Sequence, residues 1–251
     1  MIIGAPRRWR ITEMLGVPVY VDISFAILML LFTTSHGSLV YGVSFALLLA
    51  ISVVLHEFAH ALTARAFGYE TRDITISLLG GCAALCGMPR KAYQEFLTAA
   101  AGPAASFAIS GAVLALDSYG LLPGRNEYAV SCWNYLFYLN LMLGAFNLLP
   151  GFPMDGGRIF RSFMRLFLSR PKATLVAMWV GRAFAILLGF SGLHAVLTGG
   201  GWGFIRIFIA WMIWQEGMRE YRQALVEDRF DRGWTQADFD ARVSPPPYER
   251  D

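Results

Sequence analysis

Long apolar stretches separated by short polar segments fill most of the chain. A helix that spans a membrane needs about 20 mostly apolar residues, and six stretches reach or approach that length. They cover residues 22–34 with their flanks, 39–67, 96–116, 132–149, 175–197 and 202–214. The first and the last are the shortest. This pattern predicts an α-helical polytopic membrane protein with about six transmembrane helices.

Two shorter segments predict strands. Residues 11–20 contain a turn at Gly16, which is typical of a short strand or hairpin at the membrane interface. Residues 71–85 alternate in part between apolar and polar positions and contain Gly80 and Gly81, which predicts an interfacial or membrane-embedded strand pair. We therefore expect short membrane-associated β-strands beside the helices.

The composition supports a membrane protein. Hydrophobic residues make up 56% of the chain and charged residues only 16%, whereas soluble domains carry about 25% charged residues. A net charge of +3 is too small to indicate nucleic-acid binding. Three cysteines are too few for a disulfide framework, and we interpret Cys82 and Cys86 as small buried hydrophobic residues. No signal-peptide cleavage pattern follows the first apolar stretch, so we expect it to be retained.

Basic residues predict the orientation. They gather on one side of the predicted spans, as Arg7, Arg8, Arg10, Arg72, Arg90, Lys91, Arg158, Arg161, Arg165, Arg170 and Lys172. Arg125 is the only lysine or arginine in the loops on the opposite side. The positive-inside rule then places both termini and the basic loops in the cytosol, for a protein of the bacterial cytoplasmic membrane. We expect a transmembrane core over residues 1–217 and a short cytosolic tail over residues 218–251.

The sequence His-Glu-Phe-Ala-His occupies residues 56–60, near the end of the second apolar stretch. Residues four apart share one face of a helix, so His56 and His60 can bind one metal ion while Glu57 reaches a metal-bound water. Zinc lowers the pKa of bound water to about 7, and a carboxylate beside it can take the proton. Ionisable residues at the end of an uncharged run are costly unless they are paired or bind a metal. This favours a metal site over a chance pattern.

A third protein ligand is expected, because two histidines alone hold zinc poorly. The helix from Leu39 to His56 would be about 25 Å long, which puts the site inside the membrane and toward its cytosolic face. Asp155 lies at a matching depth in residues 150–157, where two prolines and three glycines break the helix. Irregular backbone at this depth is tolerated only where it lines a protein-enclosed or wet cavity. We predict Asp155 as the third ligand; the alternative is a solvated aspartate at a membrane-edge turn.

Together, residues 56–60 and the sequence Asn-Leu-Leu-Pro-Gly-Phe-Pro-Met-Asp-Gly at 147–156 resemble the paired signature of the site-2 protease family of intramembrane zinc metalloproteases. The resemblance covers residues 17–214. It implies that His56, His60 and Asp155 bind one Zn²⁺ per chain. It also implies that Glu57 is the catalytic base and that Asn147 holds the substrate carbonyl or its oxyanion.

The resemblance is to the branch of the family that consists of the membrane core alone, since no region is long enough for a PDZ domain or a CBS pair. It implies a membrane-protein substrate in the lipid bilayer, such as an anti-sigma factor, a tethered transcription regulator or a signal-peptide remnant, and it leaves room for a regulatory membrane partner. One departure is notable. Family members often carry an asparagine after the Gly102-Pro103 pair, where this chain has Ala104-Ala105-Ser106. We interpret Ala99 to Ser106 as a site of close helix packing.

These observations predict an intramembrane zinc endopeptidase that cuts transmembrane or membrane-proximal segments of membrane-tethered proteins. Two other functions are weighed against it. A proteolytically silent membrane scaffold would have no need of Glu57. A metal transporter would carry further ligands along a path across the bilayer, and the other spans offer only His194. We interpret His194 and Arg182 as buried polar contacts; the alternative for Arg182 is a position facing a water-filled cavity.

Overall fold

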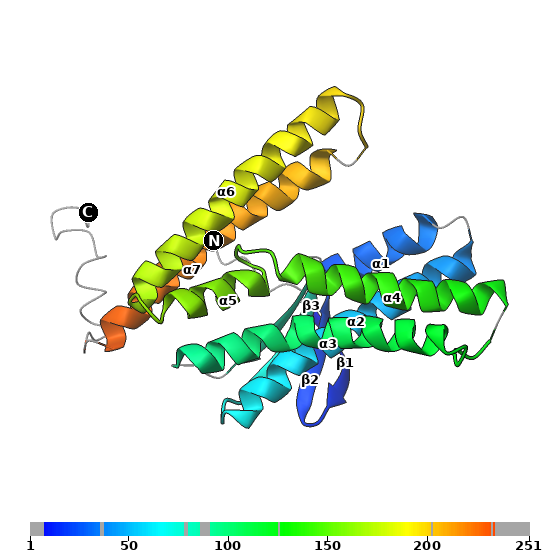
Figure 1. Cartoon of the computed structure of the whole chain (residues 1–251), viewed down its shortest axis with the longest axis horizontal. Helices are drawn as coiled ribbons and strands as arrows, with labels where there is room; N and C mark the ends of the chain where they lie inside the picture. Colours follow the sequence, from blue (N-terminus) through cyan, green and yellow to red (C-terminus); the bar gives the residue numbers. More distant parts are fainter. Residues whose placement is uncertain are drawn as a thin grey trace, which may run out of the picture. The chain divides into compact units, whose positions relative to one another are not determined.

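The computed structural model describes residues 8–35, 38–77, 80–85, 91–124, 126–201, 203–231 and 233. Within these ranges the chain forms four strands and seven helices (Figure 1). In chain order they are β1 (Arg8–Met14), β2 (Val17–Asp22), α1 (Ile23–Ser35), α2 (Leu39–Ala66), β3 (Thr71–Ser77), β4 (Gly80–Leu85), α3 (Ala92–Ser118), α4 (Glu127–Asn147), α5 (Asp155–Met164), α6 (Arg170–Leu197) and α7 (Gly203–Asp231). Their contacts divide the chain into two units, one of residues 1–149 with 154–159 and one of residues 150–153 with 160–251.

The first unit contains a four-stranded sheet in the order β1-β2-β3-β4. Strands β1 and β2 form the predicted hairpin, and Gly16 takes the positive φ of +84° that its turn requires. Strands β3 and β4 form the predicted antiparallel pair. The sequence did not predict that the two pairs join through parallel β2 and β3, with Val19 opposite Ile74. Helices α1 and α2, which lie between these strands in the chain, provide the long connection that a parallel pair needs.

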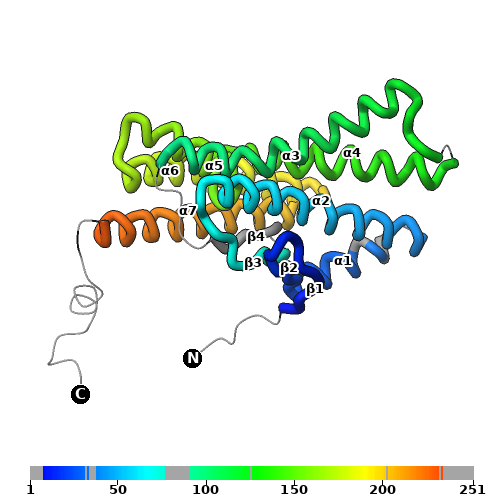
Figure 2. The backbone as a smooth tube through the Cα atoms, turned by 90° about the horizontal axis from the view of Figure 1, so that it is seen from below, coloured from blue at the N-terminus to red at the C-terminus, as the bar shows by residue number. Residues whose placement is uncertain are grey.

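The hydrophobic core of the first unit lies between the sheet and α2, which run beside each other in Figure 2. Its buried members come from β2, α1, α2 and β3: Val17, Val19, Phe25, Val53, Phe58, Ala61, Ile74 and Ile76. This packing holds the sheet against the helix that carries His56 and His60.

Helices α2, α3 and α4 pack against one another in the same unit (Figures 1 and 2). Three hydrogen bonds join them in pairs. His56 of α2 bonds to Ser106 of α3 over 2.9 Å, Ser110 of α3 donates to the Phe137 carbonyl of α4 over 2.8 Å, and Asn140 of α4 donates to Ser52 of α2 over 2.9 Å. Such bonds between apolar helices fix how far one helix slides along another.

The second unit contains the antiparallel pair α6 and α7. Gly192 and Gly203 allow the two backbones to approach closely, since a Cβ atom on Gly192 would lie 2.8 Å from the Gly203 carbonyl oxygen. Arg161 of α5 and Glu220 of α7 form a buried ion pair of 2.7 Å. Helix α7 continues past residue 217 as far as Asp231. The predicted cytosolic tail, which starts at residue 218, therefore begins inside this helix.

Two interpretations of polar residues on α6 have different outcomes. Arg182 is buried, and its guanidinium lies over the rings of Trp179 and Trp214, 5.2 and 4.3 Å from their centroids. The interpretation of His194 as a buried contact is wrong, because its side chain is exposed near the C-terminal end of the helix. The proposed burial of Cys82 and Cys86, and the positions of Arg7, Arg90 and Arg125, lie outside the residues or side chains that the structure describes.

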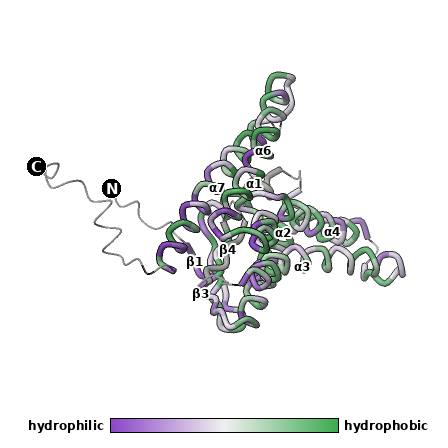
Figure 3. The backbone as a smooth tube through the Cα atoms, turned by 60° about the vertical axis from the view of Figure 1, so that its left-hand side comes forward, coloured by the Kyte–Doolittle hydropathy of each residue, from purple (hydrophilic) through white to green (hydrophobic). Residues whose placement is uncertain are grey.

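Three of the described helices are long and apolar enough to cross a membrane, namely α2, α3 and α6. Figure 3 shows the hydrophobic positions along them in green. Helix α1 has only 13 residues, fewer than the roughly 17 that a span requires. The remaining predicted stretches are helical in α4 and α7, but these two helices do not reach the same combination of length and hydropathy.

Candidate metal centre

His56 and His60 lie one turn apart on the buried face of α2. Their side chains are almost inaccessible, and the two rings meet edge to face with centroids 4.9 Å apart. Glu57, also buried, lies beside them, and one ligand atom from each of the three residues falls within 4.8 Å of the others. Helix α2 therefore carries a buried group of two imidazoles and one carboxylate.

Asp155 is the first residue of α5. The chain folds back sharply before it. The backbone at Gly156 lies so close to the carbonyl oxygens of Leu148 and Leu149, at the end of α4, that a Cβ atom there would collide with them. This close approach directs the Asp155 carboxylate at the two histidines. Its Oδ2 atom lies 3.2 Å from His56 Nε2 and 3.1 Å from His60 Nε2. The structure thus brings together the three residues that the sequence predicts as ligands.

Helix α3 supplies the partners of the other ring nitrogens. Ser106 Oγ lies 2.9 Å from His56 Nδ1, and the Thr98 carbonyl oxygen accepts a hydrogen bond of 2.6 Å from His60 Nδ1. Between them, Gly102 lets the rings approach the helix, since a Cβ atom there would collide with both imidazoles. We interpreted Ala99 to Ser106 as a site of close helix packing from the sequence. That interpretation holds for Gly102, but it missed the bond that Ser106 makes to His56.

The chemistry of the three facing atoms fits a bound zinc ion. A carbonyl oxygen can only accept, so His60 Nδ1 carries the hydrogen, and in a neutral ring Nε2 then presents a lone pair. That lone pair faces a carboxylate oxygen 3.1 Å away in a buried place. A cation between the two acceptors would stabilise them both. Two imidazole nitrogens and one carboxylate oxygen are a usual ligand set for catalytic zinc, and ligating histidines commonly use their second nitrogen in a supporting hydrogen bond.

Asn147 is the last residue of α4, and its side chain is half-buried. Its amide nitrogen donates to the Leu143 carbonyl of the same helix over 3.0 Å. Two turns earlier, sequence reasoning missed the fully buried pair of Asn140 and Ser52. Ser52 precedes His56 by one turn, so this pair connects the helix of the histidines with the helix of Asn147.

Comparison with known proteins identifies the protein family to which this chain belongs. The sequence profile described as peptidase family M50 matches residues 44–121 and 124–188. The chain belongs to peptidase family M50. A solved structure titled Site-2 Protease from Methanocaldococcus jannaschii superposes with a TM-score of 0.65 and 28% sequence identity over 86% of this chain and 95% of that one. The chain therefore has the fold of a site-2 protease.

Curated M50 relatives extend this likeness. A zinc metalloprotease of Methanocaldococcus jannaschii is 32% identical over 224 residues, which cover 88% of this chain and 62% of that one. Rip3 of Mycobacterium tuberculosis is 35% identical over 193 residues, 75% of this chain and 49% of Rip3. The chain thus spans less than two thirds of the length of these relatives. Family membership and the three apolar helices together make this M50 family member an integral membrane protein.

Proposed function

We propose that this chain is an intramembrane zinc endopeptidase that cuts transmembrane or membrane-proximal segments of other membrane proteins. One observation carries the proposal. The Nε2 atoms of two buried histidines face one oxygen of Asp155, while Nδ1 of each histidine is held by α3. In this proposal His56, His60 and Asp155 hold one Zn²⁺ per chain. The relatives named as zinc metalloproteases support the choice of metal.

The reaction requires a proton to move, and we assign that transfer to Glu57. When bound, zinc would act as a Lewis acid and lower the pKa of water to about 7. Glu57 then accepts the proton of the attacking water and delivers it to the leaving amine. Its burial keeps competing solvent away from this transfer.

Asn147 has a proposed role that requires its amide to turn. In the structure the amide donates to the Leu143 carbonyl. Rotated away from its own helix, it could donate to the oxyanion that forms when water attacks the scissile carbonyl. Such a donor is typically worth about 3 kcal/mol in the transition state.

The substrate must be extended at the cleavage point, because a helix hides its own carbonyl groups. Strand β4 offers a place for an extended segment. Among the described strands it pairs only with β3, so its second edge has no strand partner. A substrate segment could add to that edge through main-chain hydrogen bonds. Tethered transcription regulators, anti-sigma factors and signal-peptide remnants are the substrate classes that the resemblance suggests.

For the topology we propose the six spans that the sequence predicts, made by α2, α3, α4, α6, α7 and, since α1 alone is too short, α1 together with its flanking residues. The basic residues that follow Asp155 support cytosolic termini and basic loops by the positive-inside rule. This proposal also keeps the transmembrane core over residues 1–217 and the cytosolic tail over residues 218–251, in a bacterial cytoplasmic membrane.

The deciding experiment compares membrane proteomes of cells that express the wild-type chain, Glu57→Gln or Glu127→Gln. Glu127 is an exposed carboxylate on α4 and serves as the matched control. We expect Glu57→Gln to keep its zinc while one or a few single-span proteins accumulate uncut, because removing the catalytic base typically costs 10² to 10⁴ in rate, as an order of magnitude. Equal proteomes together with unchanged zinc content would reject the protease and favour a scaffold. Metal uptake that depends on His56 and not on Glu57 would favour a transporter.

A further inference from the structure

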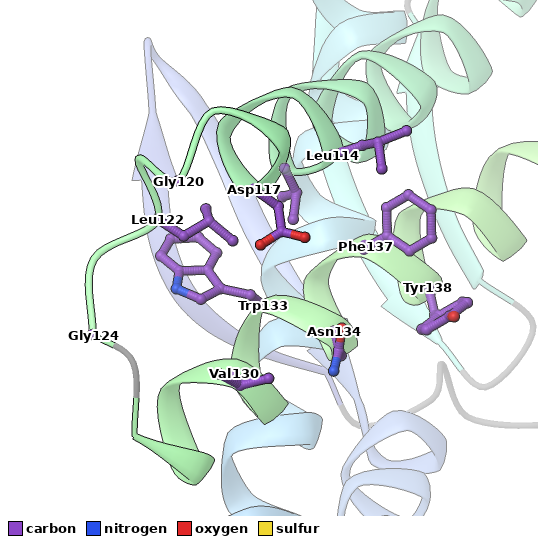
Figure 4. A pocket seen from close by; sticks show the side chains of 11 residues that line it. Leu114, Asp117, Gly120, Leu122, Gly124, Val130, Trp133, Asn134, Phe137 and Tyr138 are labelled. Carbon is purple, nitrogen blue, oxygen red and sulfur yellow. The ribbon is translucent and has the colours of Figure 1, made fainter.

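Helices α3 and α4 and residues between them line a pocket of about 550 Å³ that opens to the surface, far from the metal centre. Figure 4 shows the Asp117 carboxylate directed into it, with Trp133 on one side and Phe137 on the other. Asp117 follows Ser106, the partner of His56, by eleven residues, which is about 16 Å along the helix. The pocket is therefore separate from the proposed catalytic residues.

The aromatic walls of this pocket are held in place. Trp133 Nε1 donates to the Pro123 carbonyl over 3.1 Å, which fixes the indole against the loop between the two helices. Ser110 Oγ donates to the carbonyl of Phe137 and so fixes its backbone. The rings of Phe137 and Tyr138 meet edge to face, with centroids 4.9 Å apart. The cavity is thus formed before any ligand arrives, which is usual for small-molecule sites.

Asp117 is an exposed carboxylate, and its place on α3 favours a cation beside it. It belongs to the last turn of α3, where the helix dipole is negative, and that turn contains no basic residue. Within the ranges that the structure describes, no hydrogen bond or ion pair of its side chain is found. A carboxylate, a helix C-terminus and the faces of Trp133 and Phe137 all attract a positive charge. A wide aromatic cavity with a single carboxylate suits an organic ammonium group better than a bare metal ion.

The surroundings of the pocket identify the source of that ammonium group. Leu114 and Val130 line the pocket, and both are about half exposed. In the six-span topology proposed above, exposed apolar side chains of α3 and α4 face lipid. Asn134 and Tyr138 add an amide and a hydroxyl that can donate to phosphate oxygens. We propose that this pocket binds a zwitterionic phospholipid, with its ammonium group against Asp117 and its acyl chains along the apolar rim. The inference goes beyond the proposed proteolysis and does not depend on it, but it rests on the proposed six-span topology.

The test uses the full-length protein, stripped of lipid in detergent and offered equal amounts of phosphatidylethanolamine, phosphatidylcholine and phosphatidylglycerol. Native mass spectrometry counts the lipids that remain bound. We expect about fivefold enrichment of the two ammonium-bearing lipids over phosphatidylglycerol in the wild type, the ratio expected from one weak charge contact. Asp117→Asn should abolish the enrichment. Glu127→Gln, which removes an exposed carboxylate outside the pocket lining, should keep it.

Folding is checked by thermal unfolding of each variant without lipid. If Asp117→Asn does not fold, Trp133→Leu provides the second variant, because it removes one aromatic face and should lower the same enrichment. Equal retention of the three lipids by the wild type would overturn the proposal and leave an ordinary interfacial aromatic band. Enrichment that appears only in Arg125→Ala would also overturn it, since the pocket would then hold the chain's own arginine. Displacement of the lipid by a soluble lysine-containing peptide would assign the pocket to a protein partner instead.

Discussion

The two histidines are held by different kinds of partner, and this makes them unequally sensitive to mutation. His60 bonds to a backbone carbonyl, which no side-chain substitution removes. His56 bonds to the Ser106 hydroxyl, which a single substitution deletes. The orientation of one ligand can therefore be perturbed without touching the ligand itself.

Ser106→Ala should weaken zinc binding by about 10- to 100-fold, because loss of a hydrogen bond behind a ligating histidine typically costs that much. Competition against a zinc chelator measures the effect. The control is Ser110→Ala, one turn further along α3, whose hydroxyl bonds to Phe137 and not to a histidine. Equal zinc affinity in Ser106→Ala and the wild type would show that His56 needs no support from α3.

Gly102→Ala should abolish zinc binding, because its Cβ atom would occupy the space of both imidazole rings. Gly111→Ala on the same helix is the matched control, since a Cβ atom there meets nothing within 4 Å. The control should be neutral or more stable by up to about 1 kcal/mol, as alanine is the better helix former. Zinc content and thermal unfolding distinguish the two variants. Normal zinc content in Gly102→Ala would refute the close approach of α3 to the site.

At the scale of the elements, the sequence predicted both strand pairs and every described helix except α5, because each follows from a local pattern. Apolar runs indicate the helices, Gly16 indicates the turn of the first strand pair, and the alternation in residues 71–85 indicates the second pair. The pairing of β2 with β3 joins residues 55 positions apart and has no local signal. The sequence also showed that the helix breaks before Asp155, but not that a new helix begins there.

The site was predictable where a motif carries the chemistry. His56, Glu57, His60 and Asp155 all belong to recognisable motifs. The Thr98 carbonyl could not be found in this way, because every residue has a carbonyl group. Ser106 and Gly102 did leave a signal, since Thr98, Gly102 and Ser106 are spaced by four and share one helix face.

Asn140→Ala should lower the free energy of unfolding by about 1–3 kcal/mol, because it leaves the buried Ser52 hydroxyl without its partner between α2 and α4. Ser52→Ala should cost a similar amount. Since the two residues share one bond, the double variant should cost clearly less than the sum of the single variants. Unfolding in detergent measures all three variants. Additive effects would mean that the bond contributes nothing.

At the scale of the whole molecule, zinc would connect segments that are far apart in the sequence, because His56 and Asp155 are separated by 99 positions. Removal of zinc by a chelator should therefore lower the melting temperature of the wild type, and added zinc should restore it. Asp155→Asn should show little response to either treatment. A melting temperature that ignores the chelator in the wild type would argue against a bound metal.

The ion pair between Arg161 and Glu220 bears on how short this protein can be made. Glu220 lies three residues beyond the predicted end of the core, so a chain trimmed at residue 217 would lose the carboxylate that lies 2.7 Å from Arg161. Breaking a buried pair in this way costs about 3–5 kcal/mol. Expression of such a trimmed chain should yield less folded protein than a chain ending at Asp231. The last turns of α7 are then part of the minimal stable protein and a poor place for an affinity tag or a fusion joint.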